Sequence, residues 1–191
     1  METFDHWRTF ADADLPPDLR AALAPAADAA ARWHGDQTRP TGAPYTHHLL
    51  EALEAQVRGR GVTDTGVLAA TLLHDVVEDT SATLADVERD FGADVAELVD
   101  WVTKPPVDGG RQAKRAAKAA YLRRLRDAPP RAILVKLADR LSNVQSLDVM
   151  PPDFQRRYHA ETVTYIVPLA AGDPFYEPWF AQWSARYASL P

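Results

Sequence analysis

Residues 68–80 combine an apolar helical stripe with a dense set of polar groups, and they constrain the fold more than any other stretch. The apolar residues repeat every four positions in two series, which are Leu68, Leu72 and Val76, and Ala69, Leu73 and Val77. At about 3.6 residues per turn, both series lie on one wide side of an α-helix. We expect this helix to begin at Asp64 or Thr65, either of which can cap it, and to end near Thr80.

The other side of this helix carries one imidazole and three carboxylates, from His74, Asp75, Glu78 and Asp79. Each lies one turn from another member of the set. Like charges one turn apart destabilise a helix by roughly 0.2–0.5 kcal/mol, and burying an unpaired carboxylate costs several kcal/mol. A divalent cation reverses the sign of both effects, because it binds carboxylate oxygens and neutral imidazole nitrogens. A solvated acidic surface is the alternative, but the His-Asp pair between apolar pairs favours a cation site.

Composition restricts the class of protein. With 191 residues, 46% of them apolar, the chain can bury the core of one domain. The absence of cysteine excludes disulfides, cysteine-rich zinc sites and a cysteine nucleophile, and it fits a reducing compartment. A net charge of −6 argues against nucleic-acid binding but allows a small phosphorylated substrate. The N-terminus lacks a signal-peptide pattern and no apolar run matches a membrane span, so we expect a cytoplasmic protein without membrane association. No feature specifies an oligomeric state.

Apolar repeats at helical spacing continue along the chain, and no alternating strand pattern of any length occurs. The main segments that we expect to be helical are about 26–34, 46–60, 65–80, 83–91, 95–104, 111–126, 133–147, 154–170 and an aromatic C-terminal helix at 174–188. They predict an all-α fold, a compact bundle of roughly eight to ten helices in a single domain over residues 1–191. We interpret the basic residues of segment 111–126 as the solvent-exposed face of a helix. The alternative is that they provide positive potential beside a phosphate site.

Candidate metal ligands lie on three separate apolar-periodic segments: His48, the pair His74 and Asp75, and Asp139. A helical bundle can bring such segments together at one point. Two imidazoles and two carboxylates form a mixed nitrogen and oxygen site, which suits manganese, iron or zinc better than calcium or magnesium. Periodicity alone does not place both His74 and Asp75 on one cation, since adjacent helical residues diverge. For Asp139, the alternative is an ion pair with Arg140 or another basic neighbour.

The order His, His-Asp, Asp resembles the signature of HD-domain metal-dependent phosphohydrolases. The flanking residues resemble motifs of the hydrolase domain of RelA/SpoT homologues, in the stand-alone small alarmone hydrolase form. The matching stretches are residues 39–48 (RPTGAPYTHH), 72–80 (LLHDVVEDT) and 136–143 (KLADRLSN). Several motifs in the right order are far more specific than any one of them. The resemblance covers about residues 26–170 and implies the all-α HD-domain fold.

The resemblance also implies residue roles. The metal, usually manganese, with other divalent metals as alternatives, would be bound by His48, His74, Asp75 and Asp139. The attacking water would be oriented or deprotonated by Glu78 and Asp79. The nucleotide site would be lined by Arg39, Lys136, Arg140 and Asn143. The implied reaction is removal of the 3′-pyrophosphate from guanosine tetra- or pentaphosphate, giving GDP or GTP and pyrophosphate.

Three positions depart from the motifs of that family: Pro40 replaces a lysine, Ala43 an acidic residue and Leu49 a proline. The charge lost at Pro40, together with the change at Ala43, favours an alternative: an HD phosphohydrolase of another nucleotide, such as an NADPH phosphatase or a nucleotidase. A second alternative is a non-catalytic nucleotide-binding module, against which the pair Glu78 and Asp79 argues, because a binding module needs no groups that activate water. We expect His47 to lie at the surface or just behind the ligands.

Overall fold

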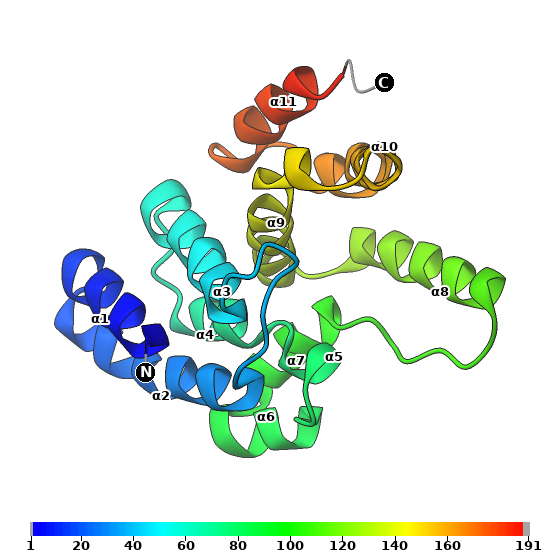
Figure 1. The fold of residues 1–191 in the computed structure, drawn as a ribbon. Helices are drawn as coiled ribbons and strands as arrows, with labels where there is room; N and C mark the ends of the chain where they lie inside the picture. The colour runs from blue at the N-terminus through cyan, green and yellow to red at the C-terminus, as the bar shows by residue number, and fades with distance from the viewer. Residues whose placement is uncertain (1, 189–191) are drawn as a thin grey trace.

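The computed structural model describes residues 2–188, and every regular element in that range is helical (Figure 1). The α-helices are α1 (Glu2–Asp14), α2 (Pro17–His34), α3 (Tyr45–Glu54), α4 (Thr65–Leu73), α5 (Val76–Asp79), α6 (Leu84–Phe91), α7 (Ala93–Val102), α8 (Arg111–Arg124), α9 (Pro130–Gln145), α10 (Pro152–Glu161) and α11 (Tyr176–Arg186). Short π-helical segments span Ala55–Arg60 and Thr162–Ile166, and 3-10 turns span Leu125–Asp127, Leu147–Val149 and Val167–Ala170. The only β pairing among the described residues is an isolated bridge between Thr38 and Pro44. The all-α prediction is confirmed.

Helix α9 lies in the middle of the fold and connects two apolar cores (Figure 1). Near its start, Ala132 and Val135 belong to a core that α1, α2, α3, α4, α6 and α7 also build. Further along, Leu141 and Val144 belong to a second core with α11. Because neighbours surround α9, its charged residues are buried as well: Lys136, Asp139 and Arg140 are 3–5% exposed. Charges buried in this way require partners.

The continuous helix predicted for residues 65–80 is wrong in one respect, because it breaks at His74 and Asp75. Helix α4 ends at Leu73 and the single turn α5 begins at Val76. The His74 ring nitrogen Nδ1 lies 2.7 Å from the carbonyl oxygen of Thr71. An uninterrupted helix would use that oxygen for the N–H of Asp75. Asp75 instead takes φ −104° and ψ −3°, and the break allows both side chains to turn toward the same point.

The loop between α2 and α3 delivers His48 to the interior. Gly42 takes a positive φ of 84°, and Arg39 closes the turn by accepting from the Gly42 N–H at 2.8 Å. Pro44 then precedes the first turn of α3. As a result His48 and Leu49 point into the protein, at 1% and 2% exposure. The π-helical extension of α3 ends at Gly61, whose φ of 72° is left-handed.

The second half of the chain is less regular than predicted. Helix α8 extends along the periphery (Figure 1), and its exposed face carries most of the basic residues of segment 111–126. It is anchored where the Tyr121 hydroxyl donates to the carbonyl of Val102 at 2.5 Å. The predicted helix 154–170 is α10 followed by a π-helical and a 3-10 segment, with Pro168 inside the last. The aromatic residues of α11 pack in the second core. Across the described residues, no helix has the length and apolar character that crossing a bilayer requires.

Candidate metal centre

Four side chains from three parts of the chain meet in what we call the His/Asp cluster: His48, His74, Asp75 and Asp139. Each offers one ligand atom, and these atoms all lie within 4.8 Å of one another. His48 comes from α3, His74 and Asp75 from the break between α4 and α5, and Asp139 from α9. The predicted convergence of the three segments is therefore present in the structure.

The two imidazoles face each other through their Nε2 atoms, which are 3.0 Å apart. The Nε2 of His74 lies 3.1 Å from Asp75 Oδ2 and 3.6 Å from Asp139 Oδ1. For His48 Nε2 the corresponding distances are 3.4 Å and 3.5 Å. Both rings are 1% exposed, so water does not screen these groups.

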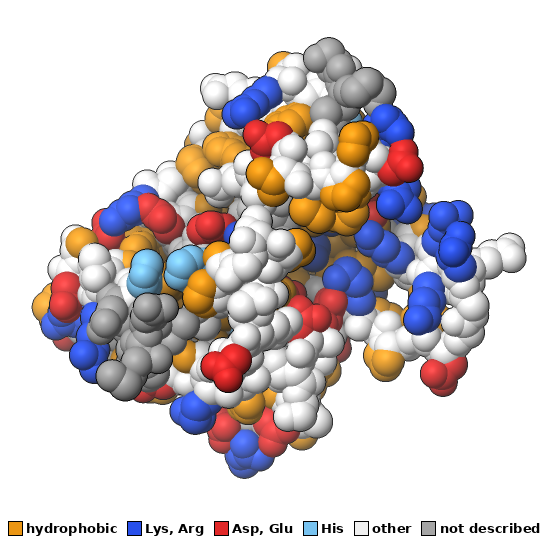
Figure 2. Space-filling model, viewed as in Figure 1, with side chains coloured by type: hydrophobic (Ala, Val, Ile, Leu, Met, Phe, Trp, Pro, Cys, Tyr) orange, Lys and Arg blue, Asp and Glu red, His pale blue; other side chains and the backbone are white. Residues whose placement is uncertain are grey.

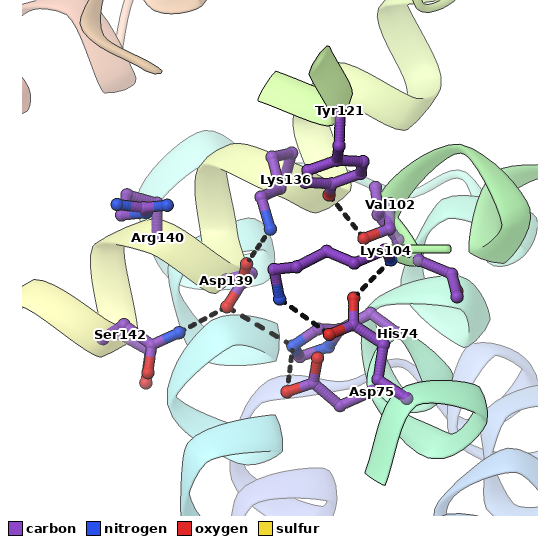
Figure 3. A network of polar contacts seen from close by, with 12 residues as sticks. His74, Asp75, Val102, Lys104, Tyr121, Lys136, Asp139, Arg140 and Ser142 are labelled. Atoms are coloured by element: carbon purple, nitrogen blue, oxygen red, sulfur yellow. Dashed lines mark hydrogen bonds and ion pairs between the residues drawn. The ribbon is translucent and has the colours of Figure 1, made fainter. Parts of the chain in front are cut away.

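The tautomer of His74 follows from its hydrogen bond to Thr71. A carbonyl oxygen only accepts, so Nδ1 carries the proton and the neutral ring presents a lone pair at Nε2. The Nε2 of His74 lies toward the carboxylates of Asp75 and Asp139 (Figure 3). It also lies toward His48 Nε2. Two ring lone pairs and two carboxylates this close together require a positive charge among them, supplied either by protons or by a metal ion. The cluster therefore fits a divalent metal of the kind that binds imidazole and carboxylate together.

Charge pairing shifts the pKa of every member of the cluster. Burial alone would raise the pKa of Asp75 and Asp139, but the imidazoles, and Lys136 beside Asp139, hold both well below the usual range. Burial alone would lower the pKa of His74, but the charge of Asp75 and a hydrogen bond with Asp139 raise it well above its ordinary value. Hydrogen bonds with Asp139 and Asp75 likewise raise the pKa of His48 against the effect of burial. Without a metal, protonated imidazoles supply the positive charge.

A pH dependence of metal affinity follows from these shifts. Below the raised pKa values of His48 and His74, a metal ion must displace protons from Nε2; above them it binds lone pairs that are already free. We expect the affinity for Mn²⁺ to increase as the pH rises above the ordinary imidazole pKa of about 6.5, with proton release that diminishes once both rings are neutral. Calorimetric titration in buffers of different ionisation enthalpy measures both quantities. An affinity independent of pH, with no proton released, would contradict the ligand assignment.

Polar neighbours hold the two carboxylates. Tyr45 directs its hydroxyl between Asp75 Oδ2, at 2.5 Å, and Asp79 Oδ2, at 2.9 Å. Asp139 accepts from Lys136 Nζ at 2.6 Å and from Asn143 Nδ2 at 2.5 Å. Lys136 is therefore the basic partner of Asp139, rather than Arg140, which the sequence suggested first. Groups that orient a ligating carboxylate in this way also tune its affinity for metal.

The cluster borders a cavity of about 180 Å³ that opens to solvent. Its acidic lining residues are Asp75, Glu78, Asp79, Asp139 and Glu161. Its basic lining residues are Lys104, Lys118, Lys136 and Arg140. Tyr45, Asn143 and Tyr158 complete the wall. Figure 2 shows charged side chains of both signs gathered in the recess between α8 and the rest of the molecule.

The predicted water-activating residues lie beside the cluster but outside it. Glu78 accepts from the backbone N–H and from the Nζ of Lys104, both at 2.6 Å. Asp79 accepts from Tyr45. Both carboxylates line the cavity, so they face the space that a substrate would fill.

Among the residues predicted to line the nucleotide site, Lys136, Arg140 and Asn143 border the cavity and Arg39 does not. The Arg140 guanidinium donates to Thr162 at 2.8 Å and to Glu161 at 3.0 Å, and it stacks on the Tyr158 ring at 4.3 Å. Arg39 is bound to Glu51 at 2.8 Å. The nucleotide role of Arg39 stays a prediction. His47 is half-buried and packs against the ring of His6 at 4.7 Å, apart from the cluster.

Several cavity residues had no assigned role in the sequence analysis: Lys104, Lys118, Tyr158 and Glu161. Lys118 belongs to the basic segment and reaches Glu161 at 2.6 Å. Lys118 therefore agrees with the alternative interpretation of segment 111–126, in which the segment places positive charge beside the site. Lys104 ends the predicted helix 95–104, but nothing in its periodicity indicates that its ammonium group reaches Glu78.

Comparison with known proteins gives consistent results. A family model described as an HD domain matches residues 26–174. The human guanosine-3′,5′-bis(diphosphate) 3′-pyrophosphohydrolase MESH1 is 42% identical over 135 residues, which is 70% of this chain and 73% of the human protein. The bifunctional (p)ppGpp synthase/hydrolase SpoT of Escherichia coli K12 is 40% identical over 177 residues. That match covers 89% of this chain and only 24% of the bacterial protein, so the chain spans about a quarter of that relative.

A solved structure shares the fold. It is described as a metazoan orthologue of SpoT that hydrolyses ppGpp and plays a role in starvation responses, and it superposes with a TM-score of 0.76 at 30% identity. The match covers 92% of this chain and 98% of that one. The sequence relatives and this structure agree with the fold predicted from the motifs.

Proposed function

The chain belongs to the HD-domain family of metal-dependent phosphohydrolases, and we propose that it removes the 3′-pyrophosphate from guanosine tetra- or pentaphosphate with manganese as its metal. The observation that carries the proposal is the His/Asp cluster beside a cavity that holds three further carboxylates and four basic side chains. The similarity to enzymes named for this reaction supports the choice of substrate.

We assign the metal to His48, His74, Asp75 and Asp139. A divalent cation held there supplies Lewis acidity, which makes water a stronger acid and neutralises phosphoryl charge. Glu78 and Asp79 remain outside the ligand set, and this leaves them available to the water and the substrate.

The bond that breaks joins the 3′-oxygen of the ribose to its phosphorus. A water oxygen forms the new bond to that phosphorus, and a carboxylate oxygen of Glu78 takes one proton from the water. The departing 3′-oxygen takes a proton from solvent to give the free hydroxyl, and Glu78 afterwards returns its proton to solvent. Tyr45 orients Asp79, because its hydroxyl is shared between Asp79 Oδ2 and Asp75 Oδ2. Proton transfer of this kind contributes roughly 10²–10⁴-fold to rate.

Basic residues of the cavity stabilise the phosphates. Lys104 pairs with Glu78 at 2.6 Å, so a phosphoryl oxygen that draws its ammonium group away frees Glu78 Oε2 to accept the proton. Burial disfavours the charged form of Lys104, yet Glu78 and Asp139 raise its pKa, so the group is cationic at neutral pH. The Nε of Arg140 is buried and has no hydrogen-bond partner among the described residues. A substrate oxygen placed against this nitrogen would satisfy the donor.

A turnover panel tests the proposal. Purified protein is incubated with ppGpp, pppGpp or NADPH in the presence of Mn²⁺, Mg²⁺ or Zn²⁺, and the products are separated by ion exchange. We expect pyrophosphate with GDP or GTP, and the highest rate with Mn²⁺. A preparation of the Glu78→Gln variant controls for contaminating enzymes.

Other outcomes of this panel would overturn the assignment. Turnover confined to NADPH or to simple nucleotides would favour the phosphatase alternative that the substitution at Pro40 suggested. Tight nucleotide binding without turnover under any metal would identify a binding module.

A further inference from the structure

A chain of three hydrogen bonds reaches His48 from the side opposite to the metal. The Nδ1 of His48 lies 2.8 Å from Ser142 Oγ. Ser142 Oγ lies 2.6 Å from Glu51 Oε2, and Arg39 Nη1 lies 2.8 Å from that same oxygen. We call these three residues, Arg39, Glu51 and Ser142, the His48 support. Ser142 is fully buried and the Arg39 side chain is only 12% exposed, so most of the support is shielded from water.

Glu51, at the end of this series of hydrogen bonds farthest from His48, determines which group donates in each of them. Glu51, paired with the Arg39 guanidinium, is a carboxylate and can only accept. The single hydroxyl proton of Ser142 therefore goes to Glu51. Ser142 Oγ is left with lone pairs, so it accepts from the N–H at Nδ1 of His48. The neutral ring then presents its lone pair at Nε2, toward the cluster.

Helical spacing places the support and the ligands on the same faces. On α3, His48 and Glu51 are three residues apart; on α9, Asp139 and Ser142 are three residues apart. Residues at this spacing lie on one side of a helix. The two helices pack against each other, so each contributes one ligand and one supporting group to the contact between them. Arg39 joins the loop before α3 to this contact.

The two histidines are supported in different ways. His74 donates from Nδ1 to a backbone carbonyl, which no side-chain substitution removes. His48 depends on side chains alone for its contact at Nδ1. A single substitution can therefore change the tautomer of His48 without touching a ligand.

We propose that Glu51 and Ser142, held by Arg39, are positioning residues that keep His48 in the tautomer with its lone pair at Nε2 and so set the affinity for the metal. This inference rests on the proposed role of His48 as a ligand. Without Glu51, Ser142 is free to donate to Nδ1, which would move the ring proton to Nε2 and point it at the metal site. Groups that orient metal-binding histidines typically contribute about 10–100-fold to affinity.

The test compares Glu51→Ala with Glu54→Ala, two equal truncations one turn apart on α3. Each removes a carboxylate that pairs with an arginine, Arg39 or Arg58 respectively, but only Glu51 contacts Ser142. We expect Glu51→Ala to weaken Mn²⁺ binding by about 10–100-fold in a calorimetric titration, and Glu54→Ala to leave it unchanged. We expect Ser142→Ala to weaken Mn²⁺ binding by a similar factor. Ser142→Thr keeps the hydroxyl, and we expect it to retain most of the wild-type affinity.

Nitrogen-15 NMR of the imidazoles gives the decisive second readout. It is recorded on metal-free protein over a series of pH values that ends in alkaline buffer. We expect a protonated Nδ1 and a bare Nε2 for His48 in the wild type and in Glu54→Ala, and a shift toward protonated Nε2 in Glu51→Ala. Because Glu51 is 41% exposed in its side chain, this variant tests the proposal without opening the core.

An unchanged tautomer and unchanged Mn²⁺ affinity in Glu51→Ala would overturn the proposal and leave the function of the cluster intact. A wild-type protein that binds no Mn²⁺ would instead refute the proposed function, and the tautomer measurement would still decide whether the support acts on His48.

Discussion

Replacing Asp75 with alanine is expected to abolish Mn²⁺ binding and pyrophosphate release together. Asp75 Oδ2 lies 3.1 Å and 3.4 Å from the two Nε2 atoms, so its loss removes a ligand and half of the negative charge of the cluster. Residues that merely orient a ligand contribute about 10–100-fold to affinity. Loss of the ligand itself is expected to exceed the upper end of that range. Metal content after dialysis and the rate with ppGpp measure the two effects.

Asp94→Ala is a matched control for this variant. Asp94 pairs with Arg131 through contacts that do not reach the cavity. We expect it to keep the wild-type metal content and rate. If Asp75→Ala retained one bound Mn²⁺ per chain, or a measurable part of the turnover, Asp75 would not be a ligand.

Glu78→Gln is expected to separate chemistry from metal binding. Glutamine keeps the shape of the side chain and can still accept from the Lys104 N–H, but its amide cannot take a proton from water. We expect kcat to fall by about 10²–10⁴-fold, while the affinity for Mn²⁺ stays unchanged because Glu78 lies outside the cluster. Glu88→Gln, at an exposed position on α6, is the control. A rate within a few-fold of wild type would remove Glu78 from the role of base.

The helical fold and the convergence of the ligands followed from periodicity and motif order. Leu68, Leu72 and Val76 do lie in the core, and His48 and Asp139 do meet the His-Asp pair. The break between α4 and α5 could not be predicted from periodicity, because the apolar repeat continues through it. It depends on the bond from His74 to Thr71, a local choice of side-chain direction that periodicity does not encode. This break also explains how adjacent residues face one point, which an unbroken helix does not allow.

The partners of the charged residues were harder to predict from the sequence, because they depend on tertiary contacts. The alternative for Asp139 was an ion pair with Arg140 or another basic neighbour, and the structure pairs it with Lys136, while Arg140 pairs with Glu161. The contact between Glu51 and Ser142 joins residues far apart in the chain. Glu51 lies outside the matching stretches, and Ser142, although it lies within residues 136–143, had no predicted role. Such pairs emerge only once α3 and α9 are packed.

Anomalous diffraction at the manganese absorption edge, from crystals soaked in Mn²⁺, tests the central claim most directly. We predict one strong peak surrounded by His48 Nε2, His74 Nε2, Asp75 and Asp139, with Glu78 and Asp79 outside bonding distance. No peak at that position, or a peak ligated by other residues, would contradict the account.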